Sequence, residues 1–180
     1  MSIIFKDRAE NTILDQNNNN NIYLFISNKP EETIFLGMKI GNMLQKGDLI
    51  AINGDLGTGK TCLIKGIALG LKSDDCVTSP SFSIIKEYTA NIPIFHFDFY
   101  RFNKAEEIEE LGYEEYFYGE GVTLIEWASK IKNYLPEEYL LINIFFANNY
   151  SFSRKIIFKP KGERYKRMVK DLKSVEYIRN

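Results

Sequence analysis

The sequence predicts one α/β domain, a three-layer sandwich around a mixed, partly antiparallel sheet. Short runs rich in β-branched and aromatic residues alternate with longer segments of helical periodicity, which is the order typical of α/β proteins. Short segments join the last strands, so part of the sheet is expected to be antiparallel. With 180 residues, the chain is long enough for one hydrophobic core and too short for two domains of ordinary size.

The strand predictions rest on apolar or alternating runs bounded by polar, Gly or Pro residues. The predicted strands are 22–26, 48–53, 82–88, 93–99, 122–126, 139–146 and 155–159. Residues 1–21 end in an Asn-rich tract and are predicted to be a flexible extension. The main domain then covers 22–160.

Two core-facing helices are predicted between these strands, because their apolar residues recur at helical spacing. The first opens at Pro30, and its apolar positions are Leu36, Ile40, Met43 and Leu44. The second opens at Gly59 and ends near Gly70, and its apolar positions are Leu63, Ile67 and Leu71.

A third helix is predicted at the basic C-terminal end, 161–180, packed on the domain or extending from it. Its apolar stripe is Tyr165, Met168, Val169 and Leu172. The segment 154–180 holds ten basic and three acidic residues, whereas 104–120 holds seven acids and one lysine. Both charge runs are interpreted as solvated surfaces, and either is a candidate face for a partner.

The overall composition excludes several classes of protein. The chain is 44% hydrophobic and carries 23 Lys and Arg against 24 Asp and Glu, which argues against a disordered chain and against a highly basic nucleic-acid binder. It contains no apolar run of the roughly 18 residues that span a bilayer, and no pattern of a signal peptide. We therefore expect a cytoplasmic protein without a membrane partner.

The most specific motif is the glycine-rich segment GDLGTGKT at 54–61, which matches Gly, four residues, Gly, Lys and Ser or Thr. It follows an apolar strand and opens a helix. Glycines let consecutive N–H groups approach a phosphate at the positive end of that helix. Lys60 supplies charge to the β- and γ-phosphates, and the Thr61 hydroxyl ligates Mg²⁺. The motif makes the predicted fold P-loop NTPase-like.

The predicted ATP-binding loop comprises Gly54, Asp55, Leu56, Gly57, Thr58, Gly59, Lys60, Thr61 and Cys62. Two acids at strand ends are expected to face it, since ligands of α/β sheets bind at the carboxyl ends of strands. Asp98 ends a strand whose phenylalanines alternate with polar residues, and Glu126 ends the apolar run 122–126. His96 is interpreted as a hydrogen-bonded structural residue.

Three other nucleotide-dependent functions share this loop. A phosphotransferase could use Asp98 as base, but Arg101 is the only arginine between Arg8 and Arg154, which leaves no arginine-rich lid. A GTPase is disfavoured because no aspartate is followed three positions later by glycine. A nucleotide-gated interaction module that does not hydrolyse ATP remains open, with the acidic segment or the basic end as its docking face.

Several segments together resemble the TsaE family, the bacterial ATPases of tRNA threonylcarbamoyladenosine (t6A) biosynthesis. The resemblance covers about residues 22–160. It rests on GDLGTGKT (54–61), TSPSF (78–82), HFDFYR (96–101), ELG (110–112), LIEW (124–127) and LPEEYLLINI (135–144). Three departures, at Thr58, Cys62 and Ala128–Ser129, touch no group assigned to phosphate or metal.

The resemblance implies a Mg²⁺-dependent ATP hydrolase, weak alone, with ATP and Mg²⁺ as cofactors. It would support t6A formation at A37 by binding a TsaB–TsaD complex and driving its cycling. Direct contact with tRNA has no support in the sequence.

The resemblance also implies roles for individual residues. Thr78 and Ser81 approach the γ-phosphate or the metal, and Trp127 lies beside the nucleotide. The implied catalytic residues are Lys60, Asp98 and Glu126. The implied metal ligands are Thr61, Asp98 and Glu126.

Overall fold

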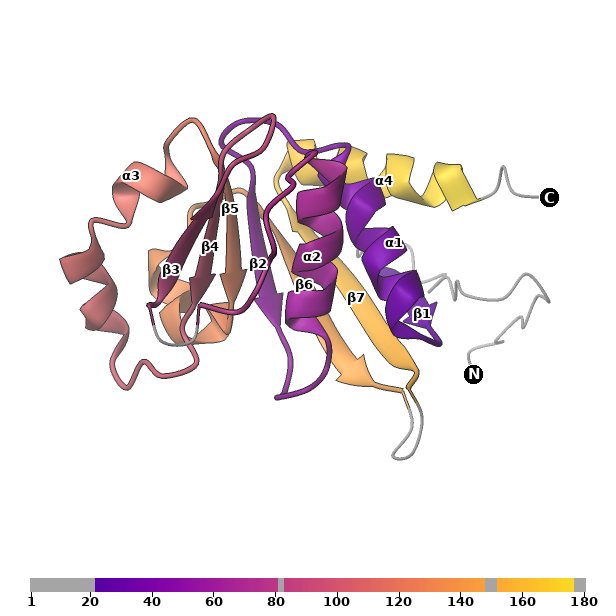
Figure 1. The fold of residues 1–180 in the computed structure, drawn as a ribbon, viewed down its shortest axis with the longest axis horizontal. Coiled ribbons are helices and arrows are strands. Elements are labelled where there is room, and N and C mark those ends of the chain that lie inside the picture. The colour runs from indigo at the N-terminus through magenta and orange to yellow at the C-terminus, as the bar shows by residue number, and fades with distance from the viewer. Residues whose placement is uncertain (1–21, 81–82, 148–151, 177–180) are drawn as a thin grey trace.

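Seven strands form one sheet in the computed structural model, which describes residues 22–80, 83–147 and 152–176 (Figure 1). Their order across the sheet is β1-β7-β6-β2-β5-β4-β3. The strands are β1 (Tyr23–Ser27), β2 (Leu49–Asn53), β3 (Ile85–Tyr88), β4 (Ile94–Asp98), β5 (Val122–Glu126), β6 (Tyr139–Phe146) and β7 (Arg154–Lys161). β6, β2, β5 and β4 run parallel, while β7 and β3 pair antiparallel with their neighbours. The predicted mixed sheet is confirmed.

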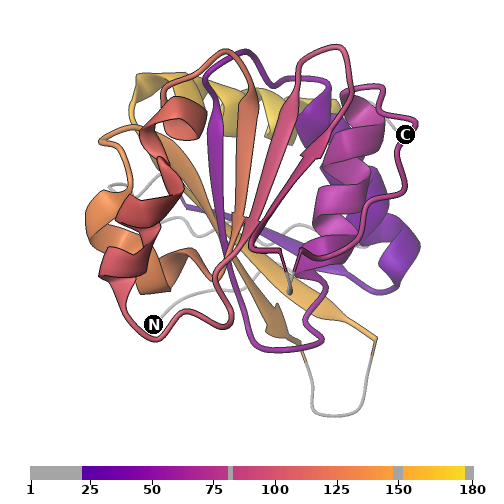
Figure 2. The same cartoon turned by 60° about the vertical axis from the view of Figure 1, so that its left-hand side comes forward.

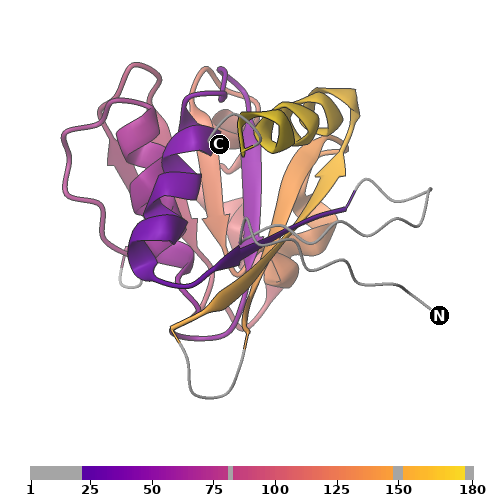
Figure 3. The same cartoon turned by 90° about the vertical axis from the view of Figure 1, so that its right-hand side faces the viewer.

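Helices cover both faces of the sheet, as the views in Figures 2 and 3 show. One face carries α1 (Pro30–Gly41), α2 (Lys60–Gly70) and α4 (Glu163–Glu176). The other carries α3 (Glu114–Phe117) and two 3-10 helices, η1 (Ala105–Leu111) and η2 (Ala128–Tyr134). Each face has its own cluster of buried apolar side chains, so the predicted three-layer sandwich is also confirmed.

The largest difference from the predicted strands is at β3, which begins at Ile85 instead of residue 82. The amides of Ser83 and Ile84 both donate to the Pro80 carbonyl and close a turn there. Ile84 has a positive φ of 67°, which ends extended backbone before the strand. At the opposite side of the sheet, β7 runs to Lys161 because it pairs with β6 over its full length.

Helix α4 packs on the sheet through the apolar stripe expected from its spacing. Those four side chains are buried: Tyr165, Met168, Val169 and Leu172. The Tyr165 hydroxyl accepts the Leu49 N–H at 2.8 Å, and the Arg164 guanidinium donates to the Asp48 carboxylate at 2.8 Å. These contacts tie α4 to the start of β2. The predicted extension 1–21 lies outside the described residues.

No helix in the described part of the chain has the length and apolar character needed to cross a bilayer.

The acidic segment 104–120 forms η1 and α3, and the buried side chains of Ile108 and Phe117 anchor these two helices. Most of its acids remain exposed.

Helices α1 and α2 pack backbone against backbone through two glycines on each. Gly37 and Gly41 on α1 face Gly66 and Gly70 on α2. A Cβ at Gly66 would lie 2.1 Å from the Ile34 carbonyl oxygen, and one at Gly70 would lie 2.4 Å from that of Met38. Gly70 ends α2 as predicted, and it also has this packing role. Close packing of this kind fixes α2, whose first turn follows the glycine-rich loop.

We predict that Gly66→Ala destabilises the protein by about 1–3 kcal/mol, because overpacking against backbone outweighs the gain of up to about 1 kcal/mol in helix propensity. Urea denaturation followed by circular dichroism measures the change. Lys65→Ala, at an exposed position of the same helix, is the control and should shift the midpoint little. A Gly66→Ala variant as stable as wild type would show that the two helices can separate freely.

Candidate functional site

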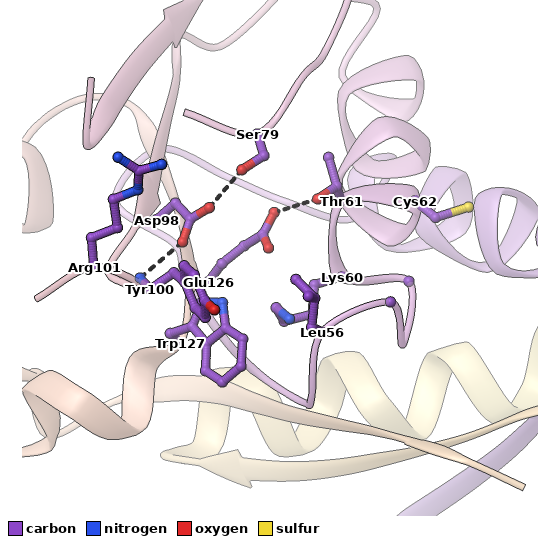
Figure 4. A pocket seen from close by; sticks show the side chains of 12 residues that line it. Leu56, Lys60, Thr61, Cys62, Ser79, Asp98, Tyr100, Arg101, Glu126 and Trp127 are labelled. Atoms are coloured by element: carbon purple, nitrogen blue, oxygen red, sulfur yellow. Dashed lines mark hydrogen bonds between the residues drawn. The ribbon is translucent and has the colours of Figure 1, made fainter. Parts of the chain in front are cut away.

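A cavity of about 410 Å³ opens at the carboxyl ends of the parallel strands, beside the N-terminus of α2 (Figure 4). Ligands of α/β sheets bind at this edge, and the volume is in the range of small-molecule sites. The cavity is lined by Leu56, Gly57, Gly59, Lys60, Thr61, Cys62, Ser79, Asp98, Tyr100, Arg101, Glu126 and Trp127.

The glycine-rich loop connects β2 to α2 in a conformation that needs glycine. Gly59 is the N-cap of α2 with φ 102°, a region that side chains rarely adopt. A Cβ at Gly54 would lie 2.5 Å from the Ile144 carbonyl oxygen of β6. The Thr58 hydroxyl donates to the Asp55 carbonyl at 2.8 Å and closes the turn. The unpaired N–H groups of the first turn of α2 begin directly after it, which is a favourable place for an anion.

Lys60 bends back over the loop. Its Nζ donates to the carbonyl oxygens of Gly54 at 2.9 Å and of Asp55 at 3.0 Å, and lies 4.1 Å from the centroid of the Trp127 ring. Burial lowers the pKa of Lys60, and the nearby carboxylates of Glu126 and Asp98 partly offset this shift. The ammonium thus lies between carbonyls, an aromatic face and two acids, where a phosphate could replace the carbonyls as partner.

Glu126 is the centre of the hydrogen bonds at the inner wall of the cavity. Its carboxylate is buried, and Oε1 accepts the Thr61 hydroxyl at 2.8 Å. The same oxygen lies 3.2 Å from His96 Nε2. The hydrogen bond joins Thr61, in the first turn of α2, to Glu126, at the end of β5. These are two of the three side chains that were expected to bind Mg²⁺.

Asp98 lies next to Glu126, at the end of the neighbouring parallel strand, with their Cα atoms in register. Its Oδ2 accepts the Ser79 hydroxyl at 2.5 Å, and its Oδ1 accepts the Tyr100 N–H at 3.0 Å (Figure 4). Like Glu126, it is almost fully buried. Both predicted acids therefore face the loop, and each accepts hydrogen bonds from neighbouring donors.

Trp127 follows β5 directly and has a left-handed backbone, with φ 59°. Such a conformation is strained for a bulky residue, and it turns the chain sharply into η2. The indole ring lies 5.1 Å from the Tyr100 ring, centroid to centroid. The two aromatic side chains form one wall of the cavity opposite the loop.

Arg154, at the start of β7, supports the glycine-rich loop from outside the cavity. Its guanidinium donates to the carbonyl oxygens of Thr58 at 3.0 Å and Gly57 at 3.3 Å, and stacks over the Phe146 ring at 4.5 Å. Sequence analysis counted Arg154 only as part of the basic end. No local motif marks it, because its partner loop is almost a hundred residues away.

Most of the predicted ATP-binding residues line the cavity, and four of them do not. Gly54, Asp55 and Thr58 belong to the glycine-rich loop but do not line the cavity. Thr78 is exposed and precedes the lining residue Ser79. Ser81 lies outside the described residues.

Cys62 lines the cavity, and burial raises the pKa of its thiol, so it is not an activated thiolate. Sequence analysis missed Ser79, Tyr100 and Arg101 as lining residues. All three belong to the TSPSF and HFDFYR segments, which could have indicated them.

The donor set fits Mg²⁺ bound together with phosphates. Among the described residues, no three His, Cys, Asp or Glu side chains cluster closely enough to hold a metal by themselves. Mg²⁺ usually takes only one or two carboxylates and completes its shell with water and phosphate oxygens. Glu126 and Asp98 supply two carboxylates, and Thr61 adds a hydroxyl beside them. Water and phosphate oxygens would complete the coordination of the metal.

Comparison with known proteins gives a consistent result. Residues 27–156 match the family model described as threonylcarbamoyl adenosine biosynthesis protein TsaE. The tRNA threonylcarbamoyladenosine biosynthesis protein TsaE of Bacillus subtilis is 41% identical over 152 residues, which cover 84% of this chain and 94% of that protein. The protein of the same name from Treponema pallidum is 34% identical over 119 residues, 66% of this chain and 88% of that protein.

A solved structure agrees with the sequence comparisons. The crystal structure of Bacillus subtilis YdiB superposes with a TM-score of 0.75 at 36% identity, covering 86% of this chain and 96% of that one. The matched residues include the glycine-rich loop, both buried acids and the strands that carry them. The chain therefore belongs to the TsaE family of threonylcarbamoyl adenosine biosynthesis proteins.

Proposed function

We propose that this protein is a Mg²⁺-dependent ATPase that binds a TsaB–TsaD complex in the cytoplasm and drives its cycling during t6A formation at A37. The observation that carries the proposal is the grouping of Lys60, Thr61 and Glu126 at the N-terminus of α2. A phosphate-binding helix end, a movable ammonium and a hydroxyl paired with a carboxylate are the parts that nucleotide hydrolysis requires. Family membership supplies the pathway.

In this proposal, each part of the site has a separate task. The N–H groups at the start of α2 hold the phosphates, and Lys60 exchanges the carbonyls of Gly54 and Asp55 for phosphate oxygens. Bound Mg²⁺ would supply positive charge that offsets the negative charge of the phosphates. Thr61, Asp98 and Glu126 are the side chains that would hold it, and one of the two acids orients the attacking water.

The rim of the cavity supports an activity that depends on partners. Leu56 at the tip of the loop is 73% exposed, and Tyr100 on the opposite wall is 45% exposed. Large apolar side chains exposed at a ligand site favour contact with another protein. We propose that TsaB and TsaD bind at this rim, where they would contact the nucleotide site directly.

The first prediction concerns Lys60→Ala. Hydrogen bonds to charged groups contribute about 1.5–3 kcal/mol, so ATP affinity should fall by about tenfold to a hundredfold. Trp127 is the only tryptophan in the chain, and its ring lies against Lys60, so its fluorescence reports binding. The control is Lys65→Ala, an exposed lysine on the same helix, which should bind normally. Unchanged affinity in Lys60→Ala would remove the phosphate role of Lys60.

The second prediction separates the two acids. Asp98→Asn and Glu126→Gln keep side-chain size and remove the charge. If the replaced acid contributes to metal binding, the variant should lose the strengthening of ATP binding by Mg²⁺. If the acid's main task is to orient the attacking water, the variant should keep that strengthening and lose turnover. Glu120→Gln, at an exposed glutamate before β5, is the matched control. Normal Mg²⁺-dependent turnover in either variant would clear that residue of its role.

The third prediction concerns the partners. ATP turnover by the protein alone should be slow and should rise when its cognate TsaB and TsaD are added, with no rise in Lys60→Ala. Phosphate release with the purified proteins measures this. Turnover unaffected by the partners would contradict the proposed pathway role, and a phosphorylated small-molecule product would instead indicate a kinase with Asp98 as base.

A further inference from the structure

We infer that His96 and Tyr88 are positioning residues that couple Glu126 to the backbone of Thr78, so that the acids of the site and the segment 78–80 respond to nucleotide together. This inference rests on the proposed function. It assigns a role to two buried side chains that do not line the cavity.

The first link joins Glu126 to His96. His96 on β4 is fully buried, and its Nε2 lies 3.2 Å from Glu126 Oε1. Paired with an ionised carboxylate, which can only accept hydrogen bonds, Nε2 is the ring nitrogen that carries a proton. In a neutral imidazole the other nitrogen, Nδ1, is then an acceptor. The contact with Glu126 thus makes Nε2 the donor of the His96 ring and Nδ1 the acceptor that faces Tyr88.

The second link joins Tyr88 to the Thr78 peptide. The Tyr88 hydroxyl donates to the Thr78 carbonyl at 2.7 Å and accepts the Thr78 N–H at 3.3 Å. Burial raises the pKa of Tyr88, so the hydroxyl keeps its proton and acts as donor. One side chain of β3 therefore holds both the N–H and the carbonyl of Thr78.

The two links meet at the Tyr88 hydroxyl, which has one proton and two acceptors within reach. The Thr78 carbonyl lies at 2.7 Å and His96 Nδ1 at 3.5 Å, so the proton points to Thr78 in this structure. Movement of Thr78 away would free that proton for His96. A hydroxyl with two alternative acceptors is a two-state element, which is what coupling between two places requires.

The segment 78–80 is also tied to the second acid. The Ser79 hydroxyl donates to Asp98 Oδ2 at 2.5 Å. Neighbouring residues of one segment are therefore connected to both acids, Ser79 directly to Asp98 and Thr78 through Tyr88 and His96 to Glu126. If nucleotide binding moves the two carboxylates, the segment 78–80 is affected through both of these connections.

The position of β3 in the sheet favours this coupling. β3 has four residues, and among the described strands it lies at the edge of the sheet and pairs only with β4. A short strand at a sheet edge has fewer backbone hydrogen bonds to neighbours than β4 and β5, which are paired on both sides, and it therefore shifts more easily. Tyr88 therefore sits on a strand that can follow the segment it holds.

The test compares Tyr88→Phe with Tyr165→Phe. Both substitutions remove a buried tyrosine hydroxyl that binds a backbone amide, but Tyr165 lies on α4, away from the cavity. In wild type and Tyr165→Phe, Mg²⁺ and ATP should slow hydrogen exchange of peptides containing Thr78 and Ser79. In Tyr88→Phe that protection should be lost and kcat should fall about tenfold, with Mg²⁺–ADP affinity unchanged.

A second variant keeps the inference testable if Tyr88→Phe does not fold. His96→Gln retains an N–H donor for Glu126 but cannot present Nδ1 to Tyr88, and it should lose the same protection. If wild type binds or hydrolyses no ATP, the proposed function fails. If wild type is active and the variant that folds behaves like Tyr165→Phe in exchange and kcat, the coupling alone is wrong.

Discussion

The arrangement of the site depends on two buried carboxylates that lie side by side at the edge of a parallel sheet. Charges of one sign in a poorly solvated place are unfavourable unless donors or cations compensate them. Glu126 receives the Thr61 hydroxyl and faces His96, and Asp98 receives the Ser79 hydroxyl and a backbone N–H. Four segments of the chain therefore converge on one point because these acids need partners.

The rest of the fold holds those partners in place. Helix α2 carries Thr61, and its packing through glycines against α1 leaves little freedom for it to slide or tilt. Arg154 from β7 supports the outer side of the loop that precedes this helix. The loop is thus held by Arg154 on its outer side and by the fixed helix that follows it. The opposite wall of the cavity includes Trp127, at the strained turn after β5. A rigid frame of this kind keeps the donors and acids of the site in a fixed relative geometry.

Much of this architecture could be predicted from local sequence. The alternating phenylalanines of β4 place Asp98 and His96 on the opposite face, because strand periodicity is fixed by backbone geometry. The glycine-rich motif placed Lys60 and Thr61 at a helix start, because the backbone before the helix adopts a conformation that favours glycine. The apolar stripe of α4 was visible in its spacing. Sequence periodicity was sufficient wherever the position of a residue is set by the helix or strand to which it belongs.

Features that depend on distant partners could not be predicted in this way. The strand order, with β2 between β5 and β6, is set by packing of the whole chain. Arg154 gave no signal because its partners are loop carbonyls far away in sequence. His96 was interpreted as a structural residue, and only the three-dimensional contacts place it between Glu126 and Tyr88. The left-handed backbone of Trp127 is likewise a result of its surroundings.

The most direct test of the central claim is a calorimetric titration of the full chain with ATP, in the presence of Mg²⁺ and again with the metal chelated. If Thr61 and the two acids hold a metal bound with nucleotide, ATP should bind at a single site and distinctly more tightly with Mg²⁺. Absence of binding in both conditions, or an affinity indifferent to Mg²⁺, would contradict the account.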